Sequence, residues 1–134
     1  MAKLVDIEGV GAVYAEKLKA AGIDTTDELL EVGATPKGRK EIAEKSGISD
    51  KLILEWVNHV DLFRISGVGS EYADLLEASG VDTIPELAQR KPENLCKKME
   101  EVNAEKKLVR RLPTVNEVTD WVEQAKKLPR VITY

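Results

Sequence analysis

The chain has 134 residues, a formal net charge of −4 at pH 7, 43% hydrophobic residues and 33% charged residues. These fractions are ordinary for a soluble helical protein, and no apolar run approaches the roughly 20 residues that span a membrane. The negative charge argues against strong non-specific nucleic-acid binding, because that affinity comes mainly from Lys and Arg neutralising phosphates.

The first half of the chain is expected to hold a short lead-in turn and four helices, at about 3–7, 11–21, 26–32, 36–46 and 49–60. Thr25 and Glu28 have the spacing of a capping box that opens the second helix. Thr35 followed by Pro36 favours the start of the third, because Thr is a good N-cap and Pro suits the first helical position. Ser49 is the expected cap of the fourth.

The second half is expected to hold helices at about 70–79, 84–90, from Pro92 onward, around 103–111, and from a Thr114 capping box to Leu128. The pair Trp56-Val57 recurs as Trp121-Val122 at an offset of 65, although the rest of the copy has an offset of 58. Seven residues are therefore inserted, most simply near 100–112, as an extra or longer helix. Pro129 stops the last helix, a short extended tail follows at 130–134, and the absence of a credible strand pair predicts an all-α fold.

One stretch occurs twice. Ile7-Glu8-Gly9-Val10-Gly11, here named the first glycine turn, returns 58 residues later as Ile65-Ser66-Gly67-Val68-Gly69, the second glycine turn. Over the windows 7–29 and 65–87, 13 of 23 positions are identical. Two glycines around one apolar residue indicate a tight turn with an inward-pointing valine. The repeat predicts two units, 1–62 and 63–134, packed into one compact domain because a lone unit of about 60 residues only marginally buries a core.

The pattern apolar-x-Gly-apolar-Gly-x-x-x-Ala, which ends at Ala15 and Ala73, resembles the helix-hairpin-helix motif. The continuation through Gly, Ile or Val, Asp and Thr resembles the N-terminal domain of RadA-type recombinases. The doubled arrangement is similar to a family of small uncharacterised bacterial proteins whose domain has no known function. The resemblance implies two tandem helix-hairpin-helix units. In many relatives the Gly-x-Gly turn presents backbone N–H groups to a nucleic-acid phosphate, and in others it only packs against protein.

The glycine turns are the first candidate site, with the N–H groups of residues 10–12 and 68–70 as donors at a helix N-terminus, where the dipole favours an anion. Asp6 and Glu8 flank the first turn and would repel phosphate. At the second turn, Ser66 and Arg64 favour phosphate binding, whereas the nearby Glu71 opposes it. The candidate residues are Gly9, Val10 and Gly11 in the first copy, and Arg64, Gly67, Val68, Gly69 and Ser70 in the second. The alternative is that the glycines only allow helices to pack.

Two basic clusters are further candidates. Residues 37–40 place three cations in the first turn of a helix, against the macrodipole, which predicts an anion site. Residues 106–111, taken as helical, place four cations in two i, i+4 pairs beside apolar packing positions. Both clusters are also compatible with solvated surface faces. The candidate residues are Lys37, Arg39, Lys40, Lys107, Arg110 and Arg111.

The aromatic residues are predicted to be structural. Trp56 and Trp121 occupy equivalent helices and are expected in the core, with Tyr14 and Tyr72 at its edge. Leu75 replaces a lysine of the first copy on an otherwise polar helix face. This apolar side chain indicates either a contact between the two halves or a contact with a partner.

Catalytic chemistry is scarce. His59 and Cys96 are the only histidine and cysteine, and no zinc-ligand spacing or nucleophile–base arrangement is visible. We therefore expect no enzymatic activity, no metal, no cofactor, no small-molecule substrate and no membrane partner. A single cysteine excludes an intrachain disulfide, and the start of the chain has no signal-peptide core, which predicts a cytoplasmic protein.

Two functions remain open from the sequence. The first is sequence-independent binding of a nucleic-acid backbone, DNA above all, through the glycine turns, because phosphate contacts position a protein without specifying sequence. The second is a protein-interaction or scaffold module in which the turns are purely structural. The first half carries 8 Lys and Arg against 12 Asp and Glu, and the second half carries 12 of each. The second half is therefore the better partner for an anion.

Overall fold

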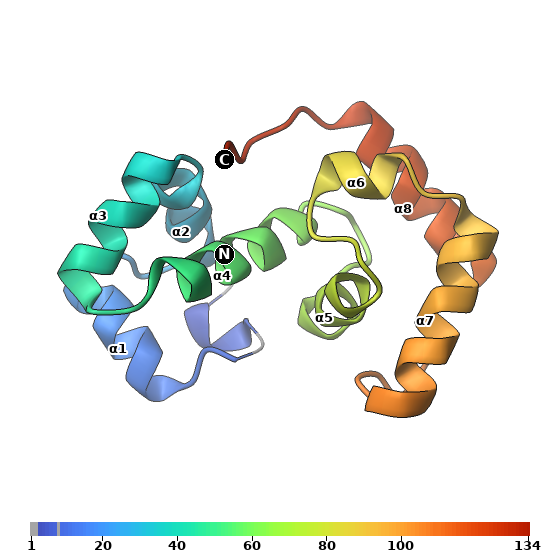
Figure 1. Cartoon of the computed structure of the whole chain (residues 1–134), viewed down its shortest axis with the longest axis horizontal. Coiled ribbons are helices and arrows are strands. Elements are labelled where there is room, and N and C mark those ends of the chain that lie inside the picture. The colour runs from blue at the N-terminus through green and yellow to red at the C-terminus, as the bar shows by residue number, and fades with distance from the viewer. Residues whose placement is uncertain (1–2, 8) are drawn as a thin grey trace. The chain divides into compact units, whose positions relative to one another are not determined.

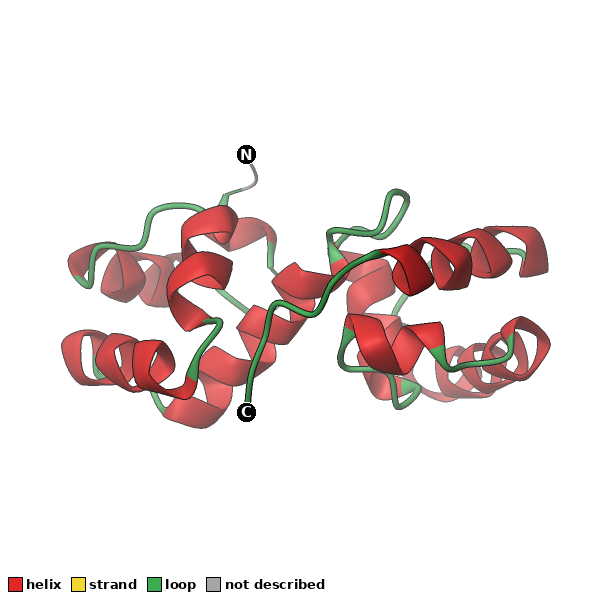
Figure 2. Cartoon of the chain, turned by 90° about the horizontal axis from the view of Figure 1, so that it is seen from above, coloured by secondary structure: helices red, strands yellow, loops and turns green. Residues whose placement is uncertain are grey.

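The computed structural model describes residues 3–7 and 9–134, and its regular structure is helical (Figure 1 and Figure 2). Eight α-helices and one 3-10 helix lie in these residues, which hold no strand beyond an isolated bridge between Lys3 and Thr25. The predicted all-α fold class is confirmed. Within the same residues, no helix combines the length and the apolar character needed to cross a membrane.

The chain divides into two compact units, where the sequence predicted units at 1–62 and 63–134. The first unit comprises the described residues up to Asp61 together with Val131–Tyr134, and the second comprises Leu62–Arg130. The sequence assigned the C-terminal tail to the second unit, but the structure places it in the first. Each unit buries its own tryptophan and its own set of aliphatic side chains, so each has a separate core.

The first unit contains η1 (Leu4–Asp6), α1 (Ala12–Ala20), α2 (Thr26–Gly33), α3 (Pro36–Ser46) and α4 (Asp50–Leu62), whose last residue is assigned to the second unit. Its predicted N-caps are present: the hydroxyl of Thr25 accepts from the N–H of Glu28 at 3.2 Å, and that of Thr35 from Gly38 at 3.1 Å. The inward faces of these elements supply aliphatic side chains that are less than 5% exposed, among them Leu4, Ile7, Leu18, Ile23, Leu29, Ile42, Ile53 and Val57.

The second unit contains α5 (Ser70–Ala78), α6 (Ile84–Ala88), α7 (Pro92–Lys106) and α8 (Val115–Lys127). The predicted capping box at the start of α8 is complete: Thr114 accepts from the Glu117 N–H at 3.1 Å, and Glu117 accepts from the Thr114 N–H at 3.0 Å. Leu75 is fully buried in the hydrophobic cluster of this unit. Val115, the first residue of α8, is 45% exposed.

The segment between α7 and α8 differs from the prediction of a helix at 103–111. Helix α7 ends at Lys106, and Lys107 has a left-handed backbone with φ +52°. The side chain of Asn103 accepts from the N–H of Val109 at 3.0 Å and donates to its carbonyl at 3.2 Å. An asparagine amide can offer the backbone an alternative to helical bonding, and this one does so. The inserted residues therefore lengthen α7 and then form a loop at 107–114, here named the basic loop.

Candidate nucleic-acid interface

The valine of each glycine turn is buried. The N–H of Val10 donates to the carbonyl of Ile7 at 3.0 Å, and that of Val68 to Ile65 at 3.1 Å. Both valine side chains are at most 5% exposed. The predicted inward orientation is confirmed, but the predicted donor role of Val10 and Val68 is corrected, because their N–H groups are already used within the turns.

The donors that remain lie one residue further on. Gly11 and Gly69 are the N-caps of α1 and α5, and a glycine offers no side-chain oxygen to the first turn of its helix. The N–H groups of a helix's first turn have no acceptor within the helix. Four other helices, α2, α3, α6 and α8, instead begin at threonines whose hydroxyls accept from the first turn. The glycine caps thus leave the N-termini of α1 and α5 without this kind of cap.

Each glycine turn lies on the tryptophan of its own unit. Gly67 has a left-handed backbone, φ +95°, and a Cβ at this position would lie 3.1 Å from Nε1 of Trp121. The equivalent distance from Gly9 to Trp56 is 3.7 Å. Both tryptophans are at most 3% exposed, which confirms their predicted core position. Tyr72 packs its ring 5.2 Å from that of Trp121, and Tyr14 is 5.1 Å from Trp56.

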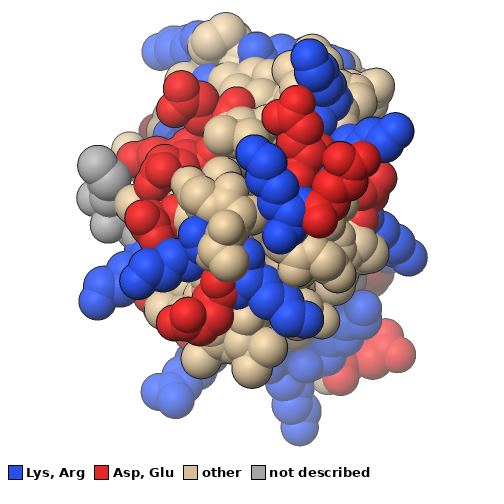
Figure 3. Space-filling model, turned by 90° about the vertical axis from the view of Figure 1, so that its left-hand side faces the viewer, with Lys and Arg blue, Asp and Glu red and all other residues tan. Residues whose placement is uncertain are grey.

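A carboxylate and an exposed apolar residue flank the first glycine turn in the sequence. The carboxylate of Asp6 accepts from the backbone N–H of Lys3 at 3.1 Å, and Glu8 lies outside the described residues. Val13, in the first turn of α1, is 69% exposed. On the face drawn in Figure 3, Lys and Arg side chains are interspersed with Asp and Glu rather than gathered in one continuous field.

The second glycine turn is braced by α8. The side-chain amide of Gln124 accepts from the N–H of Ser66 at 2.9 Å and donates to its carbonyl at 3.2 Å. Arg64 donates to the carbonyl of Pro129 at 3.0 Å and is half-buried. The sequence did not single out Gln124. The sequence feature that could have indicated this role is the position of Gln124, one helical turn beyond Trp121. The equivalent position of the first copy, at the offset of 65, is His59.

The cluster at residues 37–40 does not form one anion site. Arg39 is 7% exposed, and its guanidinium donates to the carbonyls of Gly33 at 2.9 Å and Thr133 at 2.8 Å. It also lies 5.7 Å from the centre of the Tyr134 ring. Burial lowers the pKa of Arg39 below its usual value, although the charges of Tyr134 and Asp50 act to raise it. Arg39 therefore joins the C-terminal tail to α2, and only Lys37 and Lys40 remain exposed.

The basic residues of the second unit are arranged differently from the predicted helical pairs. Arg111 forms two hydrogen bonds with the carboxylate of Glu117, both at 3.0 Å, and its carbonyl accepts from the hydroxyl of Tyr72 at 2.9 Å. Arg90 donates to the carbonyl of Ser79 at 3.4 Å, at the C-terminal end of α5, where a cation is favourable. Lys107 and Arg110 are exposed in the basic loop.

We expect acid to weaken the start of α8 through Glu117. The hydrogen bonds from Arg111 and, to a smaller extent, the one from the Thr114 N–H together lower the pKa of this carboxyl from 4.5 to about 2. A lowered pKa means that the carboxylate stabilises the folded state above pH 4.5 and that this contribution disappears as the pH falls towards 2. Thermal unfolding followed across this range should show Glu117→Gln less stable than the wild type at pH 6 and close to it near pH 2.

The control for this measurement is Glu123→Gln, since Glu123 is also an exposed α8 glutamate in an ion pair, with Lys126 at 3.3 Å. That pair is a single contact between two exposed side chains, so its loss should change the melting temperature little. A difference between Glu117→Gln and the wild type that stays constant with pH would contradict the assignment.

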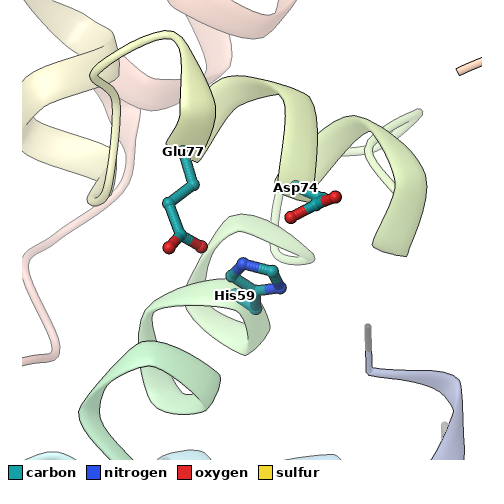
Figure 4. Close-up of side chains that lie close together, drawn as sticks. All are labelled: His59, Asp74 and Glu77. Atoms are coloured by element: carbon teal, nitrogen blue, oxygen red, sulfur yellow. The ribbon is translucent and has the colours of Figure 1, made fainter. Parts of the chain in front are cut away.

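No catalytic or metal centre is assigned. Burial, together with neighbouring glutamates, raises the pKa of the Cys96 thiol, which disfavours the nucleophilic thiolate. Asp74 and Glu77 lie three residues apart on one side of α5 (Figure 4). His59, also drawn there, belongs to α4 of the first unit. Each of the three has an interaction in the structure. The absence of a metal stays a prediction.

The fold and the repeated turns define a helical protein of two units with a glycine-capped helix in each. The chain belongs to the family described as "Domain of unknown function (DUF4332)", which matches residues 8–128. No match to the chain was found among curated proteins or among solved structures.

Proposed function

We propose that the two units are helix-hairpin-helix units of the recombinase N-terminal type and that the protein is a cytoplasmic, non-enzymatic binder of the DNA backbone. The observation that carries the proposal is the glycine cap of α5, Gly69, which offers no side-chain acceptor, whereas α2, α3, α6 and α8 begin at threonine caps. A phosphate oxygen at this helix N-terminus would accept from the first-turn N–H groups, and the helix dipole would favour it.

The second glycine turn is the better of the two for this role. Its unit carries as many basic as acidic residues, whereas the first half of the chain carries four more acids than bases. Its approach is rigid, because Gln124 holds both backbone groups of Ser66. Preorganised donors lose less conformational freedom when they bind, so a braced turn suits a phosphate contact.

The contact would read the backbone rather than the bases. Proteins that bind unpaired bases stack them on exposed aromatic rings. Beside the second glycine turn, Trp121 is 2% exposed and Tyr72 packs against it. Neither ring is presented as a platform, which favours phosphate contacts and little sequence preference.

The decisive variant is Ser70→Glu. Ser70 is the first residue of α5, where a carboxylate favours the helix dipole but repels a phosphate. Fluorescence anisotropy of a labelled DNA duplex, titrated with the whole chain at about 50 mM and about 200 mM salt, should show micromolar wild-type binding that weakens with salt. We expect Ser70→Glu to weaken binding at least tenfold while the far-UV circular dichroism is unchanged.

The matched control is Ala12→Glu, which makes the same change at the equivalent position of α1, the first helical residue after Gly11. It should leave DNA binding within about twofold, since the first turn is not the proposed site. Equal losses of DNA affinity in the two variants would contradict the choice of the second glycine turn. If the wild type does not bind DNA at the lower salt, the DNA proposal is wrong. Arg64→Glu is less clean, because it also removes the hydrogen bond to Pro129.

A protein-interaction module is the second candidate. The observation in its favour is the exposed apolar residue beside the first glycine turn, Val13 at 69%, together with Val5 at 49% on η1. Glu71 stands in place of Val13 in the second copy, so this apolar character is particular to the first unit. A folded wild-type chain that fails to bind DNA would leave this candidate ahead.

A further inference from the structure

The basic loop carries the densest positive charge of the second unit. Between Lys106 and Asn116 the sequence has four Lys or Arg and no acidic residue, in a chain whose net charge is −4. All four basic residues are exposed. Arg111 is paired with Glu117, whereas Lys106, Lys107 and Arg110 have no carboxylate partner among the described residues. Unpaired cations on one short segment produce a local positive potential that attracts anions.

The basic loop has a defined conformation. Asn103, in the last turn of α7, holds the backbone of Val109 through two hydrogen bonds. Val109 is 8% exposed, so the middle of the loop is anchored in the hydrophobic cluster. The charged side chains on either side of this anchor therefore extend from a fixed backbone.

The same loop is attached to the helix of the second glycine turn. The hydroxyl of Tyr72, the third residue of α5, donates to the carbonyl of Arg111 at 2.9 Å. The ring of Tyr72 rests against Trp121, which also lies under Gly67. The basic loop and the N-terminal turn of α5 therefore share one buried support within the second unit.

We propose that the basic loop is a second anion-binding element, which contacts another phosphate of the same nucleic-acid backbone that the α5 N-terminus binds. Lys107 and Arg110 are the binding residues, Arg111 is held by Glu117, and Tyr72 is a positioning residue that keeps the loop beside the glycine turn. This inference rests on the proposed function, since it assigns a second contact to the same ligand.

The salt dependence of binding measures such contacts directly. For B-DNA the slope of log K against log salt changes by about 0.9 for each phosphate that a cation neutralises. The double variant Lys107→Gln/Arg110→Gln should therefore reduce the magnitude of the slope by up to about 1.8. At about 50 mM salt its affinity should fall at least tenfold, as measured by anisotropy with a labelled duplex and the whole chain.

The matched control is Lys97→Gln/Lys98→Gln, which removes two exposed cations of α7 with the same change in net charge. Its slope should change by no more than the error of the fit. Tyr72→Phe removes no charge, yet it should bind about threefold more weakly and with a smaller slope, because the loop loses its hydrogen bond to α5. A purely structural role of the hydroxyl would leave the slope unchanged.

The outcomes separate the two proposals. If the loop double variant keeps the wild-type slope while Ser70→Glu still weakens binding at least tenfold, the second contact is overturned and the proposed function stands. Binding that survives Ser70→Glu but loses its slope in the loop variant would support the basic loop and overturn the glycine turn. Equal effects of the loop variant and the α7 control would overturn the loop as a specific contact, and no wild-type binding would overturn both proposals.

Discussion

Replacing Gly38 with alanine should destabilise the first unit by about 3 kcal/mol, the upper part of the range for overpacking. A Cβ at this position would overlap the backbone carbonyl oxygen of Val32 in α2 and would lie 3.2 Å from the hydroxyl of Thr35. A backbone carbonyl cannot rotate away as a side chain can, so α3 would have to move. Helix propensity acts in the opposite direction, because alanine is better than glycine by about 1 kcal/mol. Because the steric cost is larger than this gain, we expect a net loss of stability.

Urea unfolding followed by tryptophan fluorescence can test this, since Trp56 reports on the first unit and Trp121 on the second. In a Trp121→Phe background only Trp56 remains. Lys37→Ala, at the neighbouring exposed position of α3, is the control and should be neutral or slightly stabilising. A Gly38→Ala variant as stable as this control would show that α2 and α3 do not pack as closely as the structure has them.

Truncating Ile132 to alanine should cost the first unit about 3 kcal/mol, as expected for a buried isoleucine. Ile132 is 2% exposed, although it lies 71 residues beyond the last preceding residue of its unit, Asp61. The backbone next to it is fixed from both sides: Thr133 donates its N–H to Ala34 at 2.8 Å, and its carbonyl accepts from Arg39. The transition reported by Trp56 should therefore move to lower urea.

The control is Thr133→Ala. It removes a hydroxyl 3.3 Å from the Ala34 carbonyl but keeps both backbone hydrogen bonds, so it should cost no more than about 1 kcal/mol. If Ile132→Ala left the Trp56 transition where Thr133→Ala leaves it, the tail would not be part of the first unit.

Local signals were sufficient to predict most helices from the sequence. In the pattern of a threonine followed by a glutamate three residues later, the cap and the capped N–H are close in the chain. Thr25 and Thr114 cap their helices as expected, and Thr83 has the same pattern and also caps its helix. The burial of both tryptophans was predictable in the same way, because they recur on equivalent helices with apolar neighbours.

Contacts between distant residues could not be predicted. Arg39 is one of three cations in a short basic run, and nothing nearby indicates that two carbonyls, one of them 94 residues away, hold its guanidinium. The loop after α7 was missed because Lys106–Arg111 also fits an amphipathic helix. The deciding contact is the side chain of Asn103 with Val109, and an asparagine inside a helical pattern is a weak signal.

The position of Val131–Tyr134 reverses the order in which the two units can be completed during synthesis. A ribosome releases a chain from its N-terminus, and domains usually fold in that order. Here residues 62–130 form the second unit without interruption, whereas the first unit lacks Ile132 and one acceptor of Arg39 until residues 131–134 emerge. A variant that lacks residues 131–134 would therefore carry its defect in the first unit and keep the second unit whole.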